Sequence, residues 1–181
     1  MEFGAVKFDW NLYQQALARG EFFPAACRVA IQCEGPCEVG SLNAALSDFF
    51  PLLAPHLPDD VRNAMGPLVG AIATCGIKDW PWPQEELPIA PEEMANAGIG
   101  LIYSPPMVAK IVDSFQRVSP KRMTAEVTAA WPKKSNNPAD YQFSANDHFD
   151  GPADFLDYVF GWYAPFEEAA RTGHGIAIGG G

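Results

Sequence analysis

The residues best suited to chemistry gather in one polar stretch, Asn146-Asp147-His148-Phe149-Asp150. A histidine between two carboxylates can bind a metal, or act as a general base that a neighbouring aspartate orients. A simpler interpretation exists, because an aspartate at a helix start caps free amide groups and meets the positive end of the helix dipole. We favour capping by Asp150 or Asp147 with His148 in solvent. Asp147, His148 and Asp150 remain candidate catalytic residues.

The other reactive residues are scattered. The four cysteines (Cys27, Cys33, Cys37 and Cys75) include no Cys-x-x-Cys pair, so we expect thiols and no zinc site. His56 and His174 are isolated in the sequence. There is no Gly-x-Ser-x-Gly elbow, phosphate loop or dinucleotide fingerprint. The sequence therefore predicts neither a metal nor a cofactor.

Composition narrows the classes of partner. The chain has 181 residues, of which 48% are hydrophobic, and a formal net charge of −10. Such a charge repels nucleic-acid phosphates and anionic membranes, so neither is an expected partner. No apolar stretch approaches the length of a membrane span, and the N-terminal residues lack the pattern of a secretory signal. These features predict a soluble, cytoplasmic protein.

Charge is unevenly distributed along the second half. Residues Asp140–Arg171 contain seven acids and one base, whereas Met107–Lys134 carries a net charge of +4. Two helical regions with complementary outer faces would explain this pattern. The alternative is an acidic surface, including Asp147, Asp154 and Asp157, that binds a basic protein.

The turn Trp80-Pro81-Trp82 also has two interpretations. Trp80 and Trp82 either anchor an irregular, proline-rich connection to the body of the protein or belong to a binding surface.

Strands and helices must position these residues. In the first half we expect a strand over Phe3–Phe8 and a helix capped by Asp9 and closed by Gly20. Ser41 caps a further helix, which Pro51 interrupts. Two more helices follow, one beginning at Asp59-Asp60 and one over Pro67–Cys75.

The second half has clearer signals. A strand over Gly98–Tyr103 precedes two helices that begin at Ser104-Pro105 and Ser119-Pro120. The longest helix begins near Asp150-Gly151-Pro152 and ends at Gly173, with a kink expected at Pro165. A final strand covers His174–Ile178.

Three apolar patterns indicate which faces of these helices are buried. They are Val108, Ile111, Val112 and Phe115; Met123, Val127 and Trp131; and Phe155, Tyr158, Val159, Trp162, Tyr163 and Phe166.

The order of these elements resembles the YfbM-like family of small bacterial proteins of unknown function. The resemblance covers about residues 98–178 and rests on Tyr103-Ser104-Pro105 with Val108 and Ile111, on Val118-Ser119-Pro120, and on Phe166, Ala169, Ala170 and Gly173. It implies an α+β domain and supplies no catalytic residues.

We therefore predict a mostly helical single α+β domain over residues 1–178, with a small sheet of short strands and a flexible glycine tail at 179–181. The predicted function is a non-enzymatic acidic protein-binding module, of the accessory or immunity type, with a basic protein partner. The alternative is a hydrolase or transferase with a site around Asp147, His148 and Asp150. The oligomeric state is left open.

Overall fold

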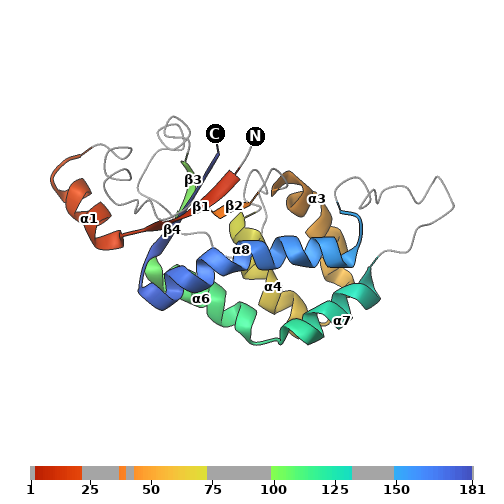
Figure 1. Ribbon diagram of the computed structural model, residues 1–181. Coiled ribbons are helices and arrows are strands. Elements are labelled where there is room, and N and C mark those ends of the chain that lie inside the picture. The colour runs from red at the N-terminus through yellow and green to blue at the C-terminus, as the bar shows by residue number, and fades with distance from the viewer. Residues whose placement is uncertain (1–2, 22–36, 40–42, 73–98, 132–148, 181) are drawn as a thin grey trace. The chain divides into compact units, whose positions relative to one another are not determined.

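The computed structural model describes residues 3–21, 37–39, 43–72, 99–131 and 149–180 (Figure 1). These residues form mainly helices, together with a small antiparallel sheet. The predicted fold class, a mostly helical α+β structure with short strands, is therefore confirmed.

The chain separates into two compact units, each assembled from segments that are distant in the sequence. The first comprises Met1–Ser41, Pro83–Val112 and Trp162–Gly181, and the second comprises Leu42–Trp82 and Asp113–Gly161. The sheet belongs to the first unit. The expectation of a single domain stays a prediction.

The first unit is built around a sheet whose described strands follow the order β2-β1-β4-β3, with every neighbouring pair antiparallel. The strands are β1 (Phe3–Phe8), β2 (Cys37–Val39), β3 (Ile99–Tyr103) and β4 (Gly175–Gly180). The strand predicted over Phe3–Phe8 has the observed bounds. Because β1 and β4 lie in the middle of this order, the sheet joins the two ends of the described chain.

The last strand extends further than the sequence indicates. The prediction ended the strand at Ile178 and assigned residues 179–181 to a loose tail. Instead, β4 continues to Gly180, which pairs with Phe3 at the start of β1. Glycine has no side chain to signal a strand, yet its amide and carbonyl groups can pair like those of any other residue. The partner strand therefore sets this boundary.

One row of residues across the sheet faces the end of α8 (Pro152–Thr172). Lys7 and Tyr103 each lie opposite Ile176, on the two sides of β4. Directly opposed residues share a face of the sheet. The Tyr103 ring packs against Phe166 of α8 with a centroid distance of 6.0 Å. This face therefore places Lys7 on the same side as the last turns of α8.

Six α-helices and one short 3₁₀ helix lie within the described residues. They are α1 (Trp10–Ala18), α3 (Asn43–Leu53), η1 (Ala54–His56), α4 (Asp59–Ile72), α6 (Pro105–Gln116), α7 (Pro120–Ala130) and α8.

The predicted helix starts are largely confirmed. Asp9 caps α1 by accepting a hydrogen bond of 3.0 Å from the Leu12 amide. Ser119 caps α7 by accepting a hydrogen bond of 3.3 Å from the Arg122 amide, and Pro120 takes the first helical position. α6 begins at Pro105 as expected, and its apolar stripe Val108, Ile111, Val112 and Phe115 is buried.

Two prolines lie inside helices, where the sequence analysis placed interruptions. α3 continues through Pro51 to Leu53, and α4 is one helix through Pro67 rather than two. A proline inside a helix costs about 3 kcal/mol. In α4, Met65 and Leu68 on the two sides of Pro67 are fully buried. Burying such a side chain contributes about 1.5–3 kcal/mol, so packing offsets the proline.

Aromatic rings form the core of the second unit. Phe49 of α3 lies 4.8 Å from Trp131, 5.7 Å from Phe149 and 5.4 Å from Phe155, measured between ring centroids. The rings of Phe149 and Phe155 meet edge to face at 5.3 Å. The predicted buried positions Phe155 and Trp131 thus meet in one cluster. Phe155 is fully buried, whereas Trp131 is half-buried.

Candidate functional site

The polar stretch predicted to carry chemistry is described only at its end. Asp147 and His148 lie outside the described residues, as do Trp80 and Trp82. Asp150 is exposed and precedes α8. The alternative of a hydrolase or transferase around these residues therefore stays a prediction.

The start of α8 is capped differently from the expectation. Pro152 is the first helical residue, and the Gly151 carbonyl accepts the first helical hydrogen bond, from Phe155. Gly151 therefore occupies the position expected of a capping aspartate. The carboxylate that binds a backbone amide at this helix start belongs instead to the third helical residue, Asp154. Its Oδ2 accepts a hydrogen bond of 3.1 Å from the Asp150 amide. Asp154 thus has a local structural role.

Three exposed carboxylates lie close together in the sequence here: Asp150 just before α8, and Asp154 and Asp157 in its first two turns. We call them the acidic face of α8. None of the three forms an ion pair with another residue in the part of the chain that the structure describes. All three belong to the second unit.

In the basic segment Met107–Lys134, at least one cation pairs with acids outside the acidic face of α8. Arg122 of α7 contacts Asp60 of α4 at 2.9 Å and Glu126 of its own helix at 3.9 Å. Lys133 and Lys134 lie outside the described residues. Arg122 thus ties α7 to α4 within the second unit.

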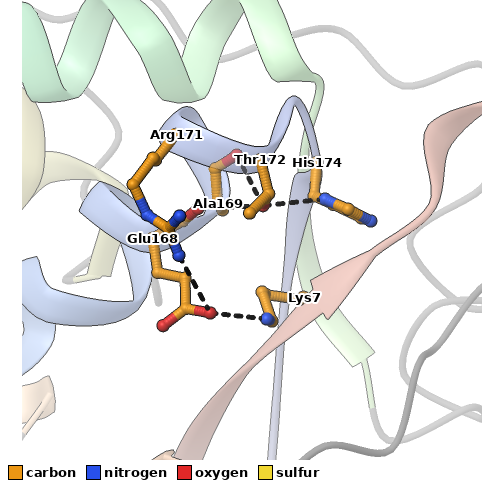
Figure 2. A network of polar contacts seen from close by, with 6 residues as sticks. All are labelled: Lys7, Glu168, Ala169, Arg171, Thr172 and His174. Atoms are coloured by element: carbon orange, nitrogen blue, oxygen red, sulfur yellow. Dashed lines mark hydrogen bonds and ion pairs between the residues drawn. The ribbon is translucent and has the colours of Figure 1, made fainter.

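A polar cluster that the sequence analysis did not identify lies in the first unit, where β1 meets the end of α8 (Figure 2). Lys7 Nζ donates a hydrogen bond of 2.7 Å to Glu168 Oε1, across 161 positions of sequence. Arg171 lies 3.8 Å from the same oxygen. The Lys7 hydrogen bond and positive charge, assisted by Arg171, lower the pKa of the Glu168 carboxyl group. No sequence signal joins these residues, because the sheet brings Lys7 to the helix.

The same cluster ends at a histidine. The Thr172 hydroxyl lies 2.9 Å from the Glu168 carbonyl oxygen and 2.8 Å from Nδ1 of His174. Gly173 has a φ of +70° and ends α8, as the sequence predicted. The amides of Gly173 and His174 donate to the carbonyls of Ala170 and Ala169, at 3.3 and 2.9 Å. This is a Schellman ending, and it fixes the backbone of His174 before β4 begins.

Within the described ranges, no group of three or more histidine, cysteine, aspartate or glutamate side chains is placed to hold a metal ion. None of the helices in the described parts is long and apolar enough to cross a membrane.

Comparisons of the chain with protein-family models, with curated proteins and with solved structures find no match. The resemblance to the YfbM-like family accordingly stays a prediction.

Proposed function

We propose that this protein is a non-enzymatic binding module that captures a basic protein through the acidic face of α8. The partner would place lysine or arginine side chains against Asp150, Asp154 and Asp157. The net charge of −10 would draw such a partner towards the molecule before contact.

Asp157 is the observation that carries this proposal. Acidic residues stabilise the first turn of a helix, because they meet the positive end of its dipole, and Asp154 fits that explanation. Asp157 lies one turn further on, where the dipole effect has largely decayed, and it is exposed. Like charges one helical turn apart destabilise a helix by about 0.2–0.5 kcal/mol. Helix stability therefore gives no reason for a carboxylate at position 157.

The contrast with Glu168 supports the same conclusion. Glu168, near the other end of α8, is paired with Lys7 and Arg171. Asp157 forms no ion pair with a described residue and is available to a partner. Exposed ion pairs are worth at most about 1 kcal/mol each, so we expect the acidic face to act mainly on the association rate.

The test begins with capture of partners from a native lysate and identification of the bound protein by intact mass. The association rate of that partner is then measured for the wild-type protein, for Asp157→Lys, and for the control Asp113→Lys. Asp113 is an exposed aspartate on α6 of the second unit, so both variants change the net charge by the same amount. Asp157→Lys should slow association several-fold, and the control should have a much smaller effect.

Salt dependence provides a second criterion. The Debye length falls from about 10 Å at 0.1 M salt to about 3 Å at 1 M, so added salt should slow wild-type association more than that of Asp157→Lys. Equal association rates for the two variants, or a rate indifferent to salt, would exclude the acidic face as the docking surface.

A further inference from the structure

The hydroxyl proton of Thr172 is committed to the helix backbone. Thr172 Oγ1 lies 2.9 Å from the Glu168 carbonyl oxygen and 3.3 Å from the Ala169 carbonyl oxygen. A carbonyl oxygen can only accept a hydrogen bond, and a hydroxyl group carries a single proton. Thr172 therefore donates to these carbonyls and offers lone pairs to any further neighbour.

That further neighbour is His174. Its Nδ1 lies 2.8 Å from Thr172 Oγ1. Because the hydroxyl proton is already used, Nδ1 must be the donor and carry a hydrogen. In a neutral imidazole only one nitrogen is protonated, so Nε2 then carries the lone pair.

The backbone around His174 is fixed, and its ring has few other polar neighbours among the described residues. The Schellman ending fixes the backbone of His174, and β4 begins at the next residue. Figure 2 shows the ring extending from the end of α8, with Nδ1 towards Thr172 and the other nitrogen away from the cluster. His174 is half-buried, and no carboxylate of a described residue pairs with it.

We propose that His174 is a reactive site, held in its Nδ1–H tautomer by Thr172, whose Nε2 is an oriented nucleophile towards neutral acyl compounds. A hydrogen bond at one ring nitrogen that orients the other is how proteins prepare histidine for chemistry. A neutral imidazole nitrogen with a free lone pair attacks electrophilic carbon, so acyl compounds are the class of reagent that this nitrogen would take. In the reaction, the Nε2 lone pair forms a bond to the acyl carbon, which gives an acylimidazolium, and the ring then loses its Nδ1 proton to solvent to give the neutral acylimidazole. The acyl carbon–oxygen bond breaks, and the leaving group departs with its electron pair.

Two measurements on the full chain test this proposal. Nitrogen NMR at a pH where the imidazole is neutral should find hydrogen on Nδ1 of His174 and none on Nε2. Diethyl pyrocarbonate, a neutral acyl reagent, should attach to Nε2 of His174, as located by mass spectrometry and NMR. The exposed His56 provides the internal reference for reagent activity.

Variants of the threonine isolate its role. Thr172→Val keeps the shape and removes the hydroxyl group, so hydrogen should appear on Nε2 and the reagent should attach to both ring nitrogens. Thr172→Ser should restore the wild-type pattern. Thr124→Val is the matched control, because the Thr124 hydroxyl makes the same contact with a carbonyl four residues back, to Pro120 at 2.9 Å. This control should leave His174 unchanged.

The proposal is overturned if wild-type His174 carries its hydrogen on Nε2. It is equally overturned if Thr172→Val leaves the tautomer unchanged, or if His56 reacts with the reagent while His174 does not.

Discussion

Replacing Phe155 with alanine tests the packing of the second unit at the point where its rings converge. Phe155 is fully buried, and its ring centroid lies 5.3 Å from Phe149, 5.4 Å from Phe49 and 5.8 Å from Trp131. The substitution removes all three ring contacts. It also leaves a cavity that the neighbouring rings can fill only in part.

The expected loss follows from these contacts. Phenylalanine-to-alanine changes in protein cores cost about 3–5 kcal/mol. Three aromatic pairs, each worth about 0.5–1.5 kcal/mol beyond the area they bury, place Phe155 in the upper part of that range. Alanine is the better helix former by several tenths of a kcal/mol, which offsets a small part. We expect the free energy of unfolding to fall by about 4 kcal/mol.

Urea unfolding measures this loss, and Phe160→Ala is the control. With a urea dependence of about 2 kcal/mol per M, the midpoint for Phe155→Ala should fall by about 2 M. Phe160 lies on the same helix but is half-buried, and its ring meets Phe115 at 5.8 Å. Its replacement makes the same change in helix propensity and should shift the midpoint by less than half as much.

Fluorescence and far-UV circular dichroism should be followed together. Fluorescence reports on the surroundings of the five tryptophans, of which Trp131 lies in the cluster, while circular dichroism reports on all helices. Coincident transitions are expected if the chain unfolds as a single domain. Equal midpoint shifts for the two variants would refute the packing argument.

Three further predictions concern single contacts. The pKa of Glu168 is lowered in the folded protein, so its pairing with Lys7 stabilises the fold above the ordinary glutamate pKa, and this stabilisation is lost as pH falls through the lowered value. Lys7→Met should therefore raise the pKa of Glu168 in an NMR titration, and its melting temperature should approach that of the wild type in acid; an unchanged pKa would contradict the pairing. Ser119→Ala should lower the free energy of urea unfolding by about 1 kcal/mol, and no measurable loss would mean that the cap is not formed in solution. Ala169→Leu should cost about 1–3 kcal/mol by overpacking, because Ala169 is fully buried, whereas Ala170→Leu at a half-buried position should cost less. If both variants melted at the wild-type temperature, both residues would lie at the surface.

Local signals determined much of the secondary structure. Asp9 and Ser119 cap helices, Pro105 and Pro120 begin them, and Gly173 ends the longest one. Each of these features acts through residues at most a few positions away. The residues that make these contacts lie within one short window of sequence, so the sequence alone could predict them.

Predictions from short stretches of sequence were wrong where contacts between distant residues decided the structure. Pro51 and Pro67 lie inside helices because the apolar residues around them are buried against other parts of the protein. Gly180 belongs to a strand because Phe3, at the other end of the chain, supplies its partner. In both cases the deciding energy comes from contacts that no short window of sequence contains.

The candidate sites divide in the same way. Asp154 and Asp157 could be selected from the sequence, since charge and helical spacing are local properties. The structure added that Asp154 holds the Asp150 amide, whereas Asp157 forms no ion pair within the described residues. Lys7 and Glu168, 161 positions apart, meet only because β1 pairs with β4 and α8 leads into β4. Sequence determined the residue types and the helix ends marked by Asp9, Ser119 and Gly173, and the tertiary fold decided which charges meet, because pairing across a sheet depends on strands that are distant in the chain.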